Sequence, residues 1–187
     1  MTIADLHRQA LDATRPLVAA TRADQHGLAT PDDEWDVRAL LNHVVAGNWW
    51  AAELAAGKSI EDVGTRLDGD VLGDDVTAAW DASAEAAAQA FEAPGALEAP
   101  CAVSYGPVPG EVYAGHRFLD VLLHGWDLAV ATGQSTDLDP GLVQAGLDVL
   151  TPQWEMLRGS GAFKTDVPVP EDGSPQDRLL AMVGRSA

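Results

Sequence analysis

Asp120 and His124 are the pair of side chains in this 187-residue chain best placed to do chemistry. They are four residues apart in an otherwise apolar segment, so a helix would present the carboxylate and the imidazole on one face. His43 lies in a second apolar helical segment, where Ala46 and Gly47 leave space beside the imidazole. Two imidazoles and one carboxylate from two packed helices can hold Zn²⁺, Ni²⁺, Fe²⁺ or Mn²⁺ with positions left open for water or substrate.

His116 precedes Asp120 by one helical turn and extends the stripe. It could be an alternative ligand, a hydrogen-bond partner of Asp120, the general base of a reaction, or the exposed start of the helix. Asp127 could fix the tautomer of His124 or hydrogen-bond between helices. Spacing alone also allows a simpler interpretation: the histidines could be hydrogen-bonded core residues, and Asp120 with His124 a plain helix ion pair.

These residues need helices to position them, and the hydrophobic periodicity predicts one helical-bundle domain over residues 1–187. Asp36 is expected to cap the second helix and Asp74 or Asp75 the third, while Asp139 followed by Pro140 should begin the fifth. Glycines at helix ends indicate the stops. The five helices are expected at about residues 3–24, 37–57, 75–93, 110–132 and 139–158.

The segments between the helices carry weaker signals. Residues 58–73 are expected to be a connecting loop, and the alternation within 97–109 predicts either a short extended excursion or a crossover connection. Residues 159–174 should form a loop, and residues 175–184 one last short helix. Pro16 and Pro152 are expected to distort the first and fifth helices, because proline lacks the backbone N–H that a helix interior needs.

The charge balance excludes two classes of partner. There are 29 acidic against 11 basic side chains, a net charge of −18, and the basic residues form no patch. Nucleic acids and anionic membranes are therefore not expected to bind, because affinity for either begins with positive charge. No apolar run is long enough to span a bilayer and no secretory signal is visible, so a cytoplasmic protein is expected.

Cys101, the single cysteine, is expected to be a small buried residue rather than a nucleophile.

Two segments resemble a known family. Trp35–Val45 and Asp120–Ala129 are similar to the signature segments of actinobacterial metal-binding proteins related to the N-terminal domain of mycothiol-dependent maleylpyruvate isomerase, within the DinB-like superfamily. Val169–Ala181 also resembles the tail of that subgroup, so the resemblance extends over essentially the whole chain. It implies an all-α, DinB-like antiparallel four-helix bundle with a long crossover connection and a short C-terminal extension.

The resemblance also implies a divalent ion, zinc foremost, bound by His43, Asp120 and His124. Members of the family use a low-molecular-weight thiol such as mycothiol to act on small-molecule substrates. A metal-dependent thiol S-transferase or isomerase is the leading expectation, with His116 as its catalytic residue. The alternatives are a non-catalytic protein that binds a metal or small ligand, and a secondary-metabolism enzyme that uses the same pocket for cyclisation or elimination. Bundles of this type often pair, so the chain could form a homodimer.

The chain departs from the family pattern in two places. The characterised isomerase carries glutamate where this chain has Asp120, and it has a second, C-terminal domain that contributes to its site. Maleylpyruvate isomerisation itself is therefore not expected of this chain.

Overall fold

The structure is a computed structural model that describes residues 1–32, 35–154, 167–170 and 172–186. The chain divides into two compact units, Met1–Ser135 and Thr136–Ala187. All of the candidate site residues lie in the first unit. The single domain expected over residues 1–187 stays a prediction.

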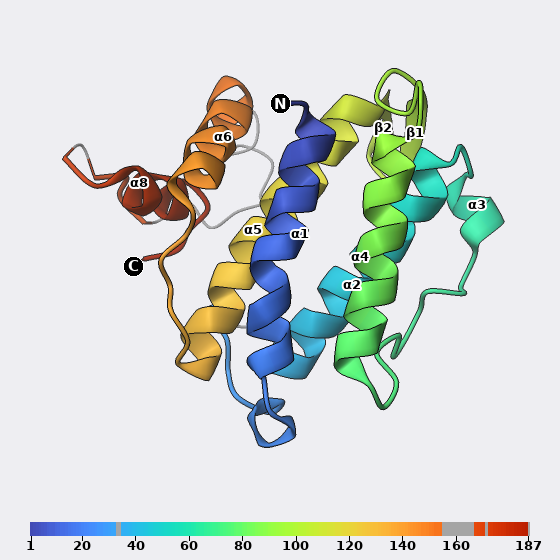
Figure 1. Ribbon diagram of the computed structural model, residues 1–187. Helices are drawn as coiled ribbons and strands as arrows, with labels where there is room; N and C mark the ends of the chain where they lie inside the picture. The colour runs from blue at the N-terminus through green and yellow to red at the C-terminus, as the bar shows by residue number, and fades with distance from the viewer. Residues whose placement is uncertain (33–34, 155–166, 171, 187) are drawn as a thin grey trace. The chain divides into compact units, whose positions relative to one another are not determined.

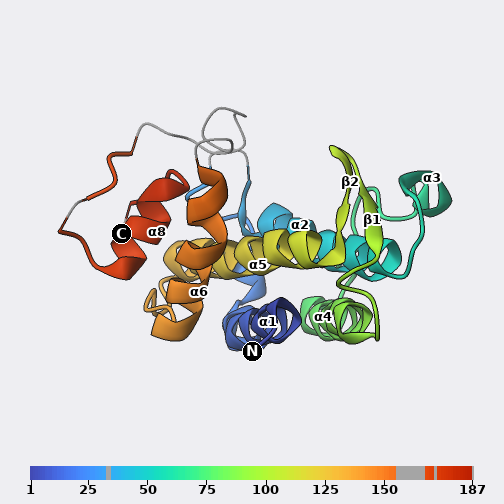
Figure 2. The same ribbon diagram turned by 90° about the horizontal axis from the view of Figure 1, so that it is seen from above.

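The first unit is built on four helices, each packed against two of the others. The helix α1 packs against α4 and α5, and α2 packs against the same two (Figures 1 and 2). Two helices run in each direction, and α2 and α4 run the same way because a long crossover joins them (Figure 1). The predicted all-α four-helix bundle with a long crossover connection is therefore confirmed. The four helices are α1 (Ile3–Ala20), α2 (Val37–Ala55), α4 (Val76–Glu92) and α5 (Gly110–Thr132).

Side-chain caps fix the helix ends where the sequence predicted them. The Asp36 carboxylate accepts a hydrogen bond from the backbone N–H of Ala39 at 2.8 Å, and the Asp75 carboxylate accepts one from Ala78 at 2.9 Å. Each bond satisfies one of the backbone donors that a helix start leaves unpaired. Gly133 ends α5 in the left-handed conformation, with φ 71°, which glycine adopts without steric cost.

The first helix is shorter than predicted. It ends at Ala20 rather than near residue 24, because Thr21 is extended and its hydroxyl donates to the carbonyl of Leu17 at 2.9 Å. A 3₁₀ turn, η1 (Ala23–Gln25), follows. Pro16 lies inside α1, within the segment that the sequence predicted to be the first helix.

The crossover between α2 and α4 is tied to α2 by polar contacts. The Asn42 side chain donates to the carbonyl of Gly69 and accepts from the N–H of Val71, both at 2.8 Å. Arg38 pairs with Asp70 at 2.6 Å. The prediction of a loop over the whole of this segment was wrong, because Ser59 caps a single helical turn, α3 (Ile60–Val63).

The segment before α5 is a two-stranded hairpin, so the extended excursion that the alternation allowed is confirmed. The strands β1 (Pro100–Val103) and β2 (Gly106–Pro109) are antiparallel, with Cys101 opposite Val108 and Val103 opposite Gly106. Strand β1 packs against α2 and both strands pack against α5.

The second unit consists of α6 (Pro140–Leu150), a 3₁₀ turn η2 (Thr151–Gln153) and α8 (Pro175–Met182). The Asp139 carboxylate caps α6 as predicted. Pro152 lies in η2, so the α-helix changes to 3₁₀ geometry there. The predicted helix end at residue 158 and most of the loop predicted over 159–174 lie outside the described residues.

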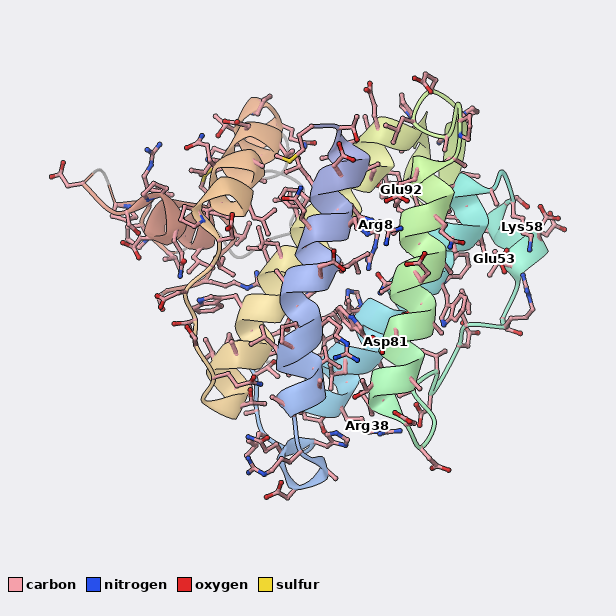
Figure 3. The ribbon with its side chains drawn as sticks, in the orientation of Figure 1. Arg8, Arg38, Glu53, Lys58, Asp81 and Glu92 are labelled. Carbon is pink, nitrogen blue, oxygen red and sulfur yellow. The ribbon has the colours of Figure 1, made fainter. Side chains whose placement is uncertain are left out.

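Ion pairs bridge α1 and α4 on the surface of the first unit. Figure 3 shows Arg8 of α1 beside Glu92 of α4, and Arg8 also pairs with Glu85 at 3.0 Å. Arg15 pairs with Asp81 at 2.9 Å. Exposed pairs of this kind contribute about 0–1 kcal/mol each, so the buried apolar faces of the helices provide most of the stability. None of the helices in the described part of the chain has the length and apolar character needed to cross a membrane.

Candidate metal centre

His43, Asp120 and His124 meet where α2 and α5 pack together. Each offers one ligand atom, and the three atoms lie within 4.8 Å of one another. The Oδ1 atom of Asp120 is 3.3 Å from Nε2 of His43 and 3.6 Å from Nε2 of His124. The structure thus brings together the three residues that the sequence analysis selected as ligands. Metal binding by them stays a prediction.

The periodicity of the helices explains why these residues converge. On α5, Arg117, Asp120 and His124 recur at intervals of three and four residues and therefore share one face. That face meets α2 at His43 and, one turn further along, at Gly47. The sequence predicted the pairing of Asp120 with His124 from this periodicity, while the partnership with His43 depends on how the two helices pack.

The Asp120 carboxylate divides its two oxygens between different partners. Its Oδ2 pairs with Nη1 of Arg117 at 2.9 Å, and its Oδ1 faces both imidazoles. Burial alone would raise the pKa of Asp120, but the charge of Arg117, followed by that of His124 and the hydrogen bond from His43, holds it well below its usual range. Asp120 is therefore ionised at neutral pH, with one oxygen directed at the histidines.

Arg117 is a site residue that the sequence analysis did not select. Its side chain is buried, and it donates to the Val44 carbonyl at 3.4 Å and to the Asn48 side chain at 3.3 Å. It fits only because residue 47 is glycine: a Cβ atom there would lie 2.4 Å from Nη1 of Arg117. The available signal was the position of Arg117 three residues before Asp120, on the same helix face.

Asp127 orients His124, one of the two roles considered for it from the sequence. Its Oδ2 atom accepts a hydrogen bond from Nδ1 of His124 at 2.9 Å, and the carboxylate is fully buried. This bond places the Nδ1 proton on the side of Asp127 and turns Nε2 toward Asp120. Histidine ligands of metals in proteins are commonly held in this way.

Trp35 lies over the cluster from the segment just before α2. Its ring stacks on His43 with centroids 4.3 Å apart, and its centroid is 5.5 Å from that of His124. The two imidazoles are edge to face, with centroids 5.0 Å apart. Trp35 was known from the sequence only as part of a family signature, and the structure shows that it restricts the orientation of His43.

The donor set fits a divalent cation. Because Nδ1 of His124 donates its hydrogen bond to Asp127, Nε2 of His124 points at Oδ1 of Asp120. Nε2 of His43 points at the same oxygen. This arrangement is favourable only with positive charge between the groups, either protons on the imidazoles or a metal ion. Donors bound about 2.0–2.1 Å from one ion lie roughly 3 Å from one another, which is close to the separations seen here.

His116 does not belong to this cluster. Its Nδ1 is 2.6 Å from the hydroxyl of Tyr105, which lies in the turn between β1 and β2. The phenol of Tyr105 is protonated at neutral pH, because tyrosine ionises only at about pH 10, and it can donate to Nδ1 of His116. The predicted catalytic role of His116 stays a prediction, and the structure adds Tyr105 as its partner.

Cys101 and His7, two side chains of types that often do chemistry, are core residues here. Cys101 is buried, as expected, and burial raises the pKa of its thiol, which makes it a poor nucleophile. His7 of α1 is fully buried against Phe91, and neither ring nitrogen has a hydrogen-bond partner among the described residues. Burial, and then the charge of Arg117, lowers the pKa of His7 to about 3, so His7 is neutral.

The chain is a helical-bundle protein in which two histidines and a carboxylate gather between two helices, and comparison with known sequences identifies its family. Residues 7–129 match the model of the mycothiol maleylpyruvate isomerase N-terminal domain. The chain belongs to this family, as the resemblance of its two signature segments indicated.

Similar chains and structures are consistent with this assignment. Two uncharacterized proteins of Mycobacterium tuberculosis, Rv0738 of strain H37Rv and MT0763 of strain CDC 1551, are each 42% identical over 185 residues, covering 96% of this chain and 96% of the relative. The crystal structure of the mycothiol-dependent maleylpyruvate isomerase matches with a TM-score of 0.63 at 15% identity, covering 85% of this chain and 72% of that one. A histidine-to-alanine mutant of that enzyme matches equally well, with a TM-score of 0.63 at 14% identity. At these identities the structural match shows the fold alone.

Proposed function

We propose that this chain is a divalent-metal-dependent enzyme that acts on a small molecule, as a thiol S-transferase or an isomerase. One observation carries the proposal: two imidazoles and a carboxylate oxygen from two helices converge on one point, although His43 and Asp120 are 77 residues apart in the chain. Asp127, Arg117 and Trp35 hold those three donors in place. Membership of a family named for a mycothiol-dependent isomerase supports a low-molecular-weight thiol as the co-substrate.

The ligands in this proposal are His43, Asp120 and His124. A divalent ion held by them would act as a Lewis acid and lower the pKa of a thiol or water bound in an open position. Zinc suits two nitrogen donors and one oxygen donor, and Ni²⁺, Fe²⁺ and Mn²⁺ are the alternatives. Asp127 accepts a hydrogen bond from Nδ1–H of His124, which leaves Nε2 as the ligand atom. Arg117 keeps Asp120 ionised.

Proton transfer is assigned to the pair formed by Tyr105 and His116. A neutral His116 accepts a hydrogen bond at Nδ1 from the Tyr105 hydroxyl. Tyr105 is the more exposed of the two, since 63% of its surface is accessible. Tyr105 is therefore the group placed to give a proton to a substrate or take one from it, and His116 is the base behind it.

Elemental analysis of the purified protein tests the metal site. Wild type should contain about one divalent ion per chain, and the His43→Ala and His124→Ala variants should contain almost none. His26→Ala is the matched control, because His26 lies outside the cluster, and it should retain the wild-type content. Little metal in wild type after incubation with Zn²⁺, Ni²⁺ or Mn²⁺ would overturn the proposal.

A turnover assay then separates the enzyme from the non-catalytic alternative. Metal-loaded protein should consume a low-molecular-weight thiol together with an electrophile, or isomerise a substrate in the presence of the thiol. Full metal content with no thiol-dependent turnover across a panel of electrophiles would favour a protein that binds metal or ligand without chemistry.

A further inference from the structure

A cavity of about 300 Å³ lies beyond the metal centre along the α2–α5 contact. The end of α2 contributes one wall and the start of α5 another, while α3 and the hairpin contribute the rest of the lining. The larger lining side chains are Trp50, Leu54, Ile60, Val103, Tyr105 and Tyr113.

The lining of this cavity selects for uncharged, apolar molecules. None of its lining side chains is charged, and three of them are aromatic. Ile60 and Tyr105 are among the large apolar side chains that remain exposed, at 40% and 63%. Apolar side chains left open around a cavity are typical of a ligand site. A charged ligand would lose its hydration there without gaining a partner.

The volume limits the size of the ligand. A cavity of about 150 Å³ accommodates benzene, so this one would hold roughly twice as many atoms, or about a dozen non-hydrogen atoms. It is close to the lower end of the range for small-molecule sites, about 300 Å³. A bicyclic aromatic compound, or one ring with a short unsaturated chain, matches these limits.

The cavity and the metal centre share the same two helix faces. On α2, Trp50 follows His43 by seven residues, and on α5, Tyr113 precedes Asp120 by seven. Both pairs are about 10 Å apart along their helices. Arg117 lies between the two sites, over Gly47. Tyr105 lines the cavity and also bonds His116, so the proposed acid–base pair is at its edge.

We propose that this cavity binds the apolar part of the substrate, and that the ligand class is a small, uncharged molecule built on an aromatic ring. The role as a substrate site rests on the proposed function, whereas binding of a neutral apolar molecule does not. Tyr105, which lines the cavity and contacts Nδ1 of His116, would face the bound molecule at the cavity edge.

Binding of 1-aminonaphthalene tests the site, because this probe is uncharged at pH 7.5, has eleven non-hydrogen atoms, and becomes more fluorescent in apolar surroundings. Wild type should bind about one equivalent. Ile60→Arg places a charge at the cavity edge and should weaken binding at least tenfold. Leu28→Arg is the matched control, since Leu28 is equally exposed at 42% but does not line the cavity, and it should bind like wild type.

Two results would overturn the site: no saturable binding in wild type, or equal weakening by Leu28→Arg and Ile60→Arg. Binding of the anion 1-naphthoate as tightly as the neutral probe would overturn the proposed ligand class. His43→Ala separates this proposal from the metal proposal, because it should lose the ion and still bind the probe. Loss of probe binding in a folded His43→Ala variant would contradict an independent apolar site.

Discussion

At the scale of single residues, the candidate centre depends on two side chains that bind the expected ligand residues on the side away from the proposed ion. Asp127 is fully buried and accepts from His124, and Arg117 neutralises the oxygen of Asp120 that faces away from the histidines. Neither residue would contact an ion. Asp127 determines which nitrogen of His124 is free to bind it, and Arg117 keeps Asp120 negatively charged. Their removal should therefore change metal affinity and stability in distinguishable ways.

Replacing Asp127 with asparagine should weaken metal binding. The amide oxygen of Asp127→Asn can still accept from Nδ1 of His124, but the negative charge that makes the imidazole a better donor is lost. Substitutions of this kind reduce metal affinity by about 10- to 100-fold. Competition with a chromophoric chelator measures the change, and Asp148→Asn, on the exposed side of α6, is the control. Unchanged affinity would show that Asp127 does not tune the site.

Replacing Arg117 with methionine should destabilise the metal-free protein. Asp120 would lose the main positive charge that lowers its pKa and would be left in a partly buried site with only the two histidines beside it. Breaking a buried pair typically lowers the free energy of unfolding by about 3–5 kcal/mol. Saturating Zn²⁺ should restore part of the loss, because the ion would supply the missing positive charge.

Urea unfolding with and without Zn²⁺ measures both effects of Arg117→Met. Arg15→Met, which breaks the exposed pair with Asp81, is the control and should lower the free energy of unfolding by at most about 1 kcal/mol. Equal losses of unfolding free energy in the two variants would show that the Arg117–Asp120 pair contributes no more to stability than an exposed ion pair.

The residues of the site were only partly predictable from the sequence. Asp120 and His124 share a helix, so their spacing was sufficient, and His43 followed from its small neighbours and the family signature. Arg117 could not be placed, because its burial depends on the missing side chain at position 47 of another helix. The contact between Tyr105 and His116 could not be predicted either, since it depends on the turn of the hairpin.

At the scale of elements, the start of α5 is held against the chain that precedes the hairpin. The N–H of Gly110 donates to the carbonyl of Ala99 at 2.8 Å, and the N–H of Glu111 donates to Leu97 at 2.8 Å. A Cβ atom on residue 110 would lie 1.9 Å from the carbonyl oxygen of Ala96. Glycine is therefore required where the hairpin joins the bundle.

Substituting Gly110 with alanine should displace this junction. The clash is with backbone rather than with a flexible side chain, so we expect a loss of about 1–3 kcal/mol in the free energy of unfolding. Gly27→Ala is the control, because a Cβ atom there would have nothing within 4 Å. Thermal unfolding of both variants provides the comparison, and a Gly110→Ala variant as stable as Gly27→Ala would contradict the close contact.

Helix boundaries followed from the sequence wherever a capping side chain determined them. Asp36, Asp75 and Asp139 each accept from the first turn of their helix, as expected for this residue type. The turn α3 and the early end of α1 were missed. Both depend on short-range competition, from Ser59 and Thr21, that hydrophobic periodicity does not reveal.

At the scale of the whole molecule, the interior of the bundle contains a histidine that folding keeps uncharged. The pKa of His7 is about 3 in the folded chain, whereas the ordinary pKa of histidine is 6.5. Between these values the unfolded chain binds a proton that the folded chain does not, so stability falls as the pH decreases. The stabilisation is complete above pH 6.5 and is lost progressively toward pH 3.

Replacing His7 with leucine should therefore flatten the dependence of stability on pH. Wild type should lose up to about 1.4 kcal/mol per pH unit through this group on acidification from about pH 6 to 4.5, and the carboxylates contribute equally to both proteins. His7→Leu should lose clearly less over that range. Urea unfolding at three pH values measures the slopes, and identical slopes would show that His7 is protonated in the folded protein.

The close fit between Gly47 and Arg117 also constrains how this bundle can evolve. A side chain at position 47 would collide with the guanidinium, so alanine or serine there requires residue 117 to move away from Asp120 or to be shortened. Losing the arginine first would leave Asp120 without its partner. Descendants of this chain should therefore vary at the two positions together, and lineages with a larger residue at 47 should have found another way to neutralise the carboxylate.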